Sequence, residues 1–118
     1  MNEIKEKSVE VSRTEVSHLL CNRDMNGAGR LFGGQLLMWI DEVAGIVAKR
    51  HCECNVTTAS IDNLQFKEAC YLGDVIVLIG YLTHVGNSSM EVRIDTYVEK
   101  KNRQTLSCQP RLLYYGCP

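Results

Sequence analysis

The sequence predicts an α+β fold in which one antiparallel sheet wraps around one long central helix. Residues 35–51 carry apolar side chains at steps of three and four residues, over so much of the helical surface that this helix should be enclosed. Residues 57–115 contain short apolar or alternating segments separated by turn residues, which is typical of consecutive antiparallel strands. A chain of 118 residues has room for one hydrophobic core. We therefore expect a single domain over residues 1–118.

The segment before the helix is expected to hold one weak strand and one loop. Residues 1–8 are polar and charged, and we expect them to be flexible. Alternating valines indicate a first strand over residues 9–16. Asparagine, aspartate and glycine dominate residues 21–30, so this segment is predicted to be a loop that leads to the helix.

Four strands are predicted after the helix. The apolar side chains of the first strand change faces near Asn63, which indicates a bulge. Gly86-Asn87 is typical of a hairpin turn, and the strand that follows it alternates so regularly that one face should be buried and the other wet. The four predicted strands are residues 57–66, 75–83, 88–101 and 106–115.

The composition argues against several classes of protein. The net charge is −1 and no basic face is evident, so we expect no binding to nucleic acid. The N-terminus lacks the apolar region of a signal peptide, and no apolar run approaches the roughly 20 residues that span a bilayer. We therefore expect a cytoplasmic protein with no membrane association. Its six cysteines should be reduced thiols, and Cys52 and Cys54 lie too close together for typical zinc ligands, so no metal site is expected.

Two features at the start of the helix have a chemical interpretation. Gly33-Gly34 opens the helix, where unpaired N–H groups and the positive end of the dipole could polarise a carbonyl and hold an oxyanion. Asp41 falls at the edge of the apolar stripe, whereas the adjacent Glu42 falls on the polar side. A half-buried carboxylate in that position could activate water or attack as a nucleophile.

Asn26 is the third candidate, because its amide could orient water or donate to a carbonyl. Each of the three features also has an ordinary structural explanation. A glycine pair makes a tight turn before a helix, an aspartate can lie on a helix rim, and Asn-Gly is a common turn pair. Taken singly, these features leave the function open.

Taken together, residues 24–41 resemble the start of the hotdog-fold acyl-CoA thioesterases of the YciA and brain acyl-CoA hydrolase type. That family has an asparagine, a short gap, a Gly-Gly pair and an acidic residue seven positions into the helix, which matches Asn26, Gly33-Gly34 and Asp41. Residues 58–74 are similar to the family's next strand and turn, and residues 86–92 to its following hairpin. The resemblance covers about residues 9–101.

The resemblance implies a hotdog fold and an activity, the hydrolysis of acyl-CoA thioesters to coenzyme A and a carboxylic acid. It implies that the Gly34 N–H polarises the thioester carbonyl and that Asp41 of one subunit activates water or attacks, with help from Asn26 of the other subunit. It also implies a homodimer, assembled further as a trimer of dimers, with no metal or organic cofactor. The substrate-binding residues implied by the resemblance are Phe32, Gly33 and Phe66, together with Gly86, Asn87 and Ser88 near the 3′-phospho-ADP end of coenzyme A.

The C-terminal segment departs from the family pattern. The family's last strand lies inside the sheet, but Pro110 cannot donate a backbone hydrogen bond there. Either this strand is bulged at Pro110, or the final residues, 103–118, diverge or are truncated.

Two other functions remain open on the sequence. A hotdog hydratase would need a histidine near Asp41, but His51 lies ten residues along the helix, roughly 15 Å away. A non-catalytic, sensor-type hotdog domain would bind acyl-CoA without turning it over, and the ones that act in transcription regulators carry a DNA-binding segment. No helix-turn-helix pattern precedes residue 20.

Overall fold

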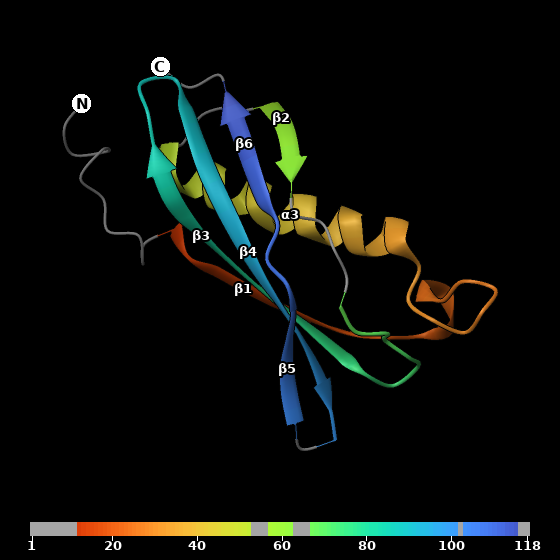
Figure 1. The fold of residues 1–118 in the computed structure, drawn as a ribbon. Coiled ribbons are helices and arrows are strands. Elements are labelled where there is room, and N and C mark those ends of the chain that lie inside the picture. Colours follow the sequence, from red (N-terminus) through yellow and green to blue (C-terminus); the bar gives the residue numbers. More distant parts are fainter. Residues whose placement is uncertain (1–11, 53–56, 63–66, 102, 116–118) are drawn as a thin grey trace.

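The computed structural model describes residues 12–52, 57–62, 67–101 and 103–115. In this part of the chain, one long helix lies across one face of a six-stranded sheet (Figure 1). The sheet order is β1-β3-β4-β6-β2, with β5 paired to β4, and all pairs are antiparallel. The predicted α+β architecture is confirmed. The elements are β1 (Thr14–Leu19), η1 (Asn22–Asp24), α3 (Gly33–Cys52), β2 (Thr57–Asp62), β3 (Val75–Val85), β4 (Ser89–Lys100), β5 (Arg103–Cys108) and β6 (Arg111–Tyr115).

Helix α3 buries one face against the sheet. It packs on β1, β3, β4 and β6, and its core side chains are fully enclosed. Gly80 of β3 allows this close approach, because a Cβ there would lie 2.9 Å from Val47 Cγ2. The expectation that the helix is enclosed all round is wrong for a single chain, since Leu37 and Met38 are 37% and 66% exposed. The described sheet covers one side of the helix. Leu37 and Met38 lie on a side that the sheet does not cover. The buried residues of α3 are Leu36, Trp39, Ile40, Val43, Ala44, Val47, Ala48, His51 and Cys52.

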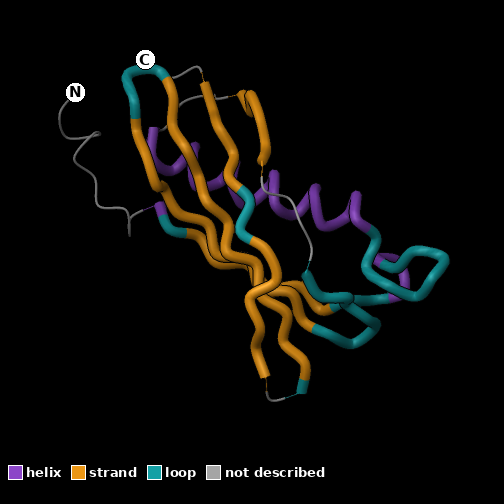
Figure 2. Tube along the Cα trace, in the orientation of Figure 1, coloured by secondary structure: helices purple, strands orange, loops and turns teal. Residues whose placement is uncertain are grey.

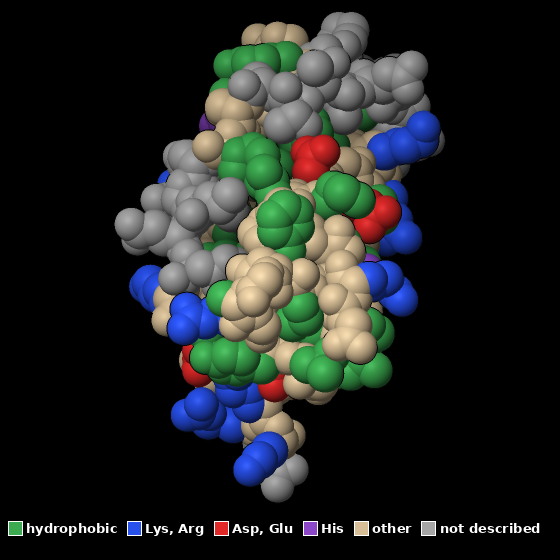
Figure 3. Space-filling model, turned by 90° about the vertical axis from the view of Figure 1, so that its right-hand side faces the viewer, with side chains coloured by type: hydrophobic (Ala, Val, Ile, Leu, Met, Phe, Trp, Pro, Cys, Tyr) green, Lys and Arg blue, Asp and Glu red, His purple; other side chains and the backbone are tan. Residues whose placement is uncertain are grey.

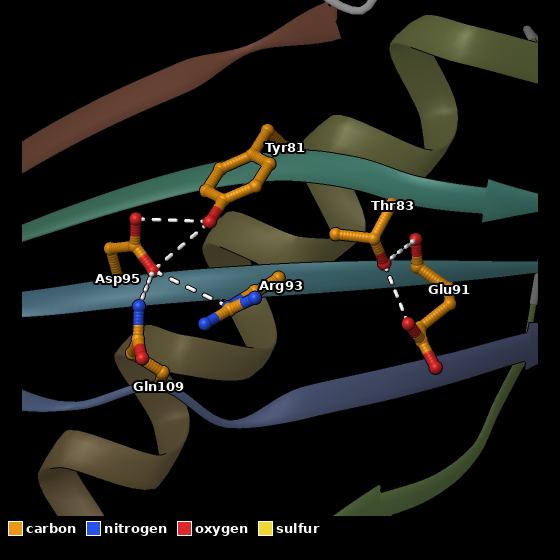
Figure 4. A network of polar contacts seen from close by, with 6 residues as sticks. All are labelled: Tyr81, Thr83, Glu91, Arg93, Asp95 and Gln109. Atoms are coloured by element: carbon orange, nitrogen blue, oxygen red, sulfur yellow. Dashed lines mark hydrogen bonds and ion pairs between the residues drawn. The ribbon is translucent and has the colours of Figure 1, made fainter.

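The β3–β4 hairpin is where the sequence predicted it. The Gly86 N–H donates to the Ser89 carbonyl at 2.8 Å and closes the turn. The inward side chains of β4 alternate as predicted and are buried. The opposite face is only partly exposed rather than wet, because its polar side chains contact one another (Figure 4). The inward residues of β4 are Met90, Val92, Ile94, Thr96 and Val98.

The strands at the two edges differ from the prediction. The first strand was expected over residues 9–16 but runs from Thr14 to Leu19, because the alternating pattern at its start was short. Two of the valines that predicted it, Val9 and Val11, lie outside the described residues, whereas Val16 lies within β1. Strand β2 occupies the first part of its predicted range and shifts register between Thr58 and Ser60. The bulge predicted near Asn63 lies outside the described residues.

The last strand predicted from the sequence, residues 106–115, is divided into two strands, β5 and β6. Both pair with the same edge of β4. A short loop separates β5 from β6 (Figure 2). Pro110 lies in this loop, and its carbonyl accepts the Ile94 N–H at 3.0 Å. The Thr96–Cys108 and Arg93–Arg111 pairs keep one register, so the proline breaks the ladder without displacing the chain. The register shift lies between Leu106 and Cys108 instead. The strand is therefore bulged, but at Ser107 rather than at Pro110, where the sequence placed the bulge.

Candidate functional site

Asp24 holds the loop before the helix in place. Its side chain accepts the Cys21 N–H at 2.8 Å and the Gln35 Nε2–H at 3.0 Å, and its carbonyl accepts the Phe32 N–H at 2.8 Å. Asp24 is 2% exposed. These bonds connect the beginning of the loop to the first turn of α3, so one buried carboxylate sets the position of Asn26 relative to the helix. In the sequence, nothing but its place in a polar loop distinguishes Asp24.

The bond from the Cys21 N–H is the main reason that the pKa of Asp24 is lowered; burial opposes it and the Gln35 bond adds to it. A carboxyl with a lowered folded pKa stabilises the fold above its unfolded pKa of about 3.9, and this stability is lost as the pH falls through the folded pKa.

We expect Asp24→Asn to reduce the free energy of unfolding at pH 7 by about 1–3 kcal/mol. The difference from wild type should shrink below pH 4. Urea unfolding of wild type and variant at equal protomer concentration, at pH 7 and below pH 4, measures the loss of stability and its pH dependence. A difference in unfolding free energy that does not change with pH would contradict a stabilising role of the Asp24 carboxylate.

Asn26 makes the turn that its sequence context predicts. Its Oδ1 accepts the Ala28 N–H at 2.9 Å and the Arg30 N–H at 3.1 Å. The residue is exposed, and its Nδ2 group has no hydrogen bond to the described part of the chain. The turn explanation and the chemical one are thus compatible, because the oxygen orders the loop while the Nδ2 donor is not used by the described residues.

The N-terminus of α3 is open. The Phe32 carbonyl accepts the first helical bonds, from the N–H groups of Gln35 and Leu36 at 3.1 and 3.2 Å. The N–H groups of Gly33 and Gly34 precede these, and neither has an acceptor among the described residues. The Phe32 ring lies against the second glycine, where an added Cβ would come within 2.6 Å of Phe32 Cε2. Glycine at position 34 thus lets an aromatic ring and a free N–H group share one surface.

Asp41 lies two turns further along the helix and is exposed. Its carbonyl accepts the Tyr114 hydroxyl at 3.5 Å. Seven residues separate it from Gly34, which is about 10 Å along a helix axis. The expectation of a half-buried carboxylate is wrong for the single chain, because the described sheet does not cover this side of the helix. Figure 3 faces the end at which α3 begins, and hydrophobic side chains are grouped in its middle.

A pocket of about 370 Å³ joins two of the predicted residues, Asn26 and Gly33. Its far wall is the segment 67–70, held to the loop by a 2.8 Å bond from the Leu31 N–H to the Cys70 carbonyl. Burial raises the pKa of the Cys70 thiol to about 11, so this cysteine is a poor nucleophile at neutral pH. The pocket also contains a carboxylate, Glu68, which no motif in the sequence indicates. The lining residues are Asn26, Arg30, Leu31, Gly33, Lys67, Glu68, Ala69 and Cys70.

The other predicted residues do not join this pocket within one chain. The turn of Gly86, Asn87 and Ser88 lies at the opposite end of the molecule from the start of α3 (Figure 1). Phe66 lies outside the described residues. Among the residues that the structure does describe, no histidine, cysteine or carboxylate side chains gather as a metal site, and no helix is long and apolar enough to cross a membrane.

The sequence of residues 28–104 matches the thioesterase superfamily. The chain is 39% identical over 87 residues to the human cytosolic acyl coenzyme A thioester hydrolase, a match that covers 74% of this chain and 23% of the relative. It is 42% identical over 76 residues to the uncharacterized acyl-CoA thioester hydrolase YkhA of Bacillus subtilis, which covers 64% of this chain and 44% of that protein. The chain thus spans less than half the length of these curated relatives.

Solved structures share the fold. An apo-hexameric acyl-CoA thioesterase superposes with a TM-score of 0.89 at 37% identity, over 93% of this chain and 72% of that one. A variant of the Staphylococcus aureus acyl-CoA hydrolase in complex with coenzyme A superposes with a TM-score of 0.88 at 28% identity, over 93% and 67%. The hotdog fold that the sequence predicted is confirmed. By its sequence match and its fold, the chain belongs to the thioesterase superfamily.

Proposed function

We propose that this protein hydrolyses acyl-CoA thioesters. The observation that carries the proposal is the open N-terminus of α3. The N–H groups of Gly33 and Gly34 have no acceptor among the described residues, and Gly33 lines the Asn26 pocket. Donors that point at a carbonyl oxygen stabilise the charge that develops there during acyl transfer. The relatives named above as acyl-CoA thioester hydrolases support the choice of substrate class.

In the proposed reaction, the thioester carbonyl oxygen accepts the Gly34 N–H at the start of the helix. The Asp41 carboxylate takes a proton from water, whose oxygen attacks the carbonyl carbon. When the tetrahedral intermediate collapses, the carbon–sulfur bond breaks, and the thiolate of coenzyme A takes the proton. Direct attack by Asp41 would give an anhydride that water then hydrolyses, with the same products. The chemistry needs neither a metal nor an organic cofactor.

We propose that each site is completed by two subunits. Within one chain, Asp41 lies about 10 Å along the helix from Gly34 and does not line the Asn26 pocket. The exposed Leu37 and Met38 leave an apolar surface on the Asp41 side, which a second copy would cover. The Gly86–Ser88 turn lies far from the Asn26 pocket of its own chain. If this turn binds the nucleotide end of coenzyme A, the turn at each site would therefore belong to the partner subunit.

The hexameric form of the apo thioesterase supports a further assembly into a trimer of dimers. We also propose a cytoplasmic location, because the human relative is described as cytosolic.

Variants of the Staphylococcus aureus enzyme support the choice of site residues. Solved structures of that enzyme carry alanine in place of one asparagine, one aspartate and one threonine. The asparagine and the aspartate have the same separation in sequence as Asn26 and Asp41 have here. By the same offset, the threonine falls on Thr58 of β2.

The proposal is tested by measuring the release of free thiol from acyl-CoAs of increasing chain length. We expect turnover of at least part of this series. Binding of acyl-CoA without thiol release by the folded, oligomeric protein would contradict the proposal and favour a sensor-type domain. The same panel gives the preferred chain length of the acyl group.

A further inference from the structure

A second pocket lies outside the candidate active site. It has a volume of about 260 Å³ and lies where β4, β5 and β6 meet, beside the start of the segment at residue 67. Arg93 and Arg111 contribute to it from the side of the strands that faces away from the helix, since their neighbours Val92 and Leu112 are buried on the helix side. Figure 4 shows this side of the sheet, with Arg93 and Gln109 in front and α3 behind.

The bulge at Ser107 shapes this pocket. The register shift between Leu106 and Cys108 leaves Ser107 opposite no partner of β4. Its carbonyl accepts the Lys67 N–H at 3.4 Å, which brings that lysine to the rim. Its side chain is fully buried, lines the pocket, and its Oγ has no hydrogen-bond partner among the described residues. A buried hydroxyl without a partner is costly, so a ligand oxygen in the pocket would satisfy it.

The charge of the pocket is positive. Lys67, Arg93 and Arg111 line it, and the carboxylate of Asp95 forms an ion pair with Arg93. Asp95 is already engaged, because its Oδ1 accepts Gln109 Nε2–H at 2.8 Å and both of its oxygens contact the Tyr81 hydroxyl. Arg93 Nε is buried and lies 3.7 Å from Asp95 Oδ1, too far for a hydrogen bond.

Glu68 is the other carboxylate near this surface, and it pairs with Arg103 at 3.5 Å rather than with the pocket. Three cations, a free buried hydroxyl and an amide thus surround one small space. Arginine pairs, together with hydroxyl and amide donors, are the groups that recognise phosphate oxygens.

We propose that this pocket binds a phosphate or diphosphate group. The guanidinium groups of Arg93 and Arg111 contact its oxygens, the Ser107 hydroxyl donates to one of them, and Lys67 adds charge at the rim. Lys67 also lines the Asn26 pocket, so the two pockets are neighbours. The phosphate therefore comes from one of two sources, the nucleotide end of a coenzyme A thioester or a separate phosphate ligand. The binding site itself does not depend on the proposed hydrolysis.

The test begins with the binding of inorganic diphosphate to the purified oligomer, measured by calorimetry at low and high salt. We expect saturable binding that weakens as salt rises. Arg111→Gln and Ser107→Ala should each weaken it by about tenfold or more. The serine variant should keep the thermal stability of the free protein, because it removes an unsatisfied hydroxyl. Lys49→Gln, which removes an exposed positive charge on α3, is the matched control and should bind as wild type does.

Equal affinity of wild type, Arg111→Gln and Ser107→Ala for diphosphate would overturn the proposal, as would the absence of saturable binding. The source of the phosphate is then read from kinetics of Arg111→Gln with acyl-CoA and with the matching acyl-pantetheine. A rise in KM for acyl-CoA alone assigns the pocket to the substrate's own phosphates. An unchanged KM for both, with diphosphate binding lost, assigns it to a separate ligand. Diphosphate binding by a protein that releases no thiol would leave this site standing and reject only the proposed activity.

Discussion

Replacing Asp41 with alanine is expected to lower kcat for thiol release from acyl-CoA by about 10²–10⁴-fold, the usual contribution of a positioned general base. The substitution removes an exposed carboxylate whose side chain is not part of the hydrophobic core, so the fold should remain. The measurement is steady-state thiol release, with circular dichroism and light scattering to show that the variant is folded and assembled. KM should change much less than kcat, because the carboxylate acts on water rather than on substrate binding.

Glu42→Ala is the matched control for this prediction. It removes the adjacent carboxylate on the same helix, which is also exposed. We expect it to keep activity within a few-fold of wild type. Similar losses in both variants would show a general effect of helix charge, and no loss in Asp41→Ala would remove Asp41 from the mechanism.

Mixing two inactive variants is expected to restore activity if each site takes Asn26 and Asp41 from different chains. The first variant is Asp41→Ala. The second is Asn26→Asp, which removes the Nδ2 donor but keeps an oxygen that can accept the Ala28 and Arg30 N–H groups. Random pairing makes half of the dimers mixed, and each mixed dimer has one intact site, so recovery should approach about a quarter of wild-type activity.

The control for this experiment is each variant taken alone through the same unfolding and reassembly. Activity should stay at the level of the single variants in those samples. If mixing restores nothing while mixed dimers are detected by native mass spectrometry, then both residues serve the same site from one chain. The two-subunit proposal would then be rejected, and a movement of α3 or of the loop would be needed to bring Asp41 to the pocket.

Local sequence patterns predicted the elements that depend on neighbouring residues. The helical period in 35–51 predicted α3 because its buried face repeats with each turn. The alternation in β4 and the Gly86-Asn87 turn predicted the central hairpin for the same reason. The start of β1 was wrong by five residues, since a short alternating run at a chain end has few positions to define it.

In the C-terminal segment, the position of the bulge depends on how the strands pair, and the local sequence does not determine it. Pro110 indicated an interruption, and the interruption is there. The register shift, however, lies at Ser107, a residue with no turn or bulge signal of its own. Its position depends on how β5 and β6 align along β4, which involves pairs that are distant in sequence. The basic pocket follows from that alignment and could not be foreseen from its scattered residues.

The sequence by itself determined the order and type of the central elements and placed Asn26, Gly33-Gly34 and Asp41 in one motif. Tertiary structure decided the rest: that buried Asp24 holds the loop on the helix, that Asn26 and Gly33 share a pocket, and that Asp41 lies apart from it. The physical reason is that apolar residues on a helix surface indicate only that this surface is buried, and not which part of which chain buries it. Whether the cover is the same chain or a second copy depends on the shape of the sheet, which the periodicity of one helix does not contain.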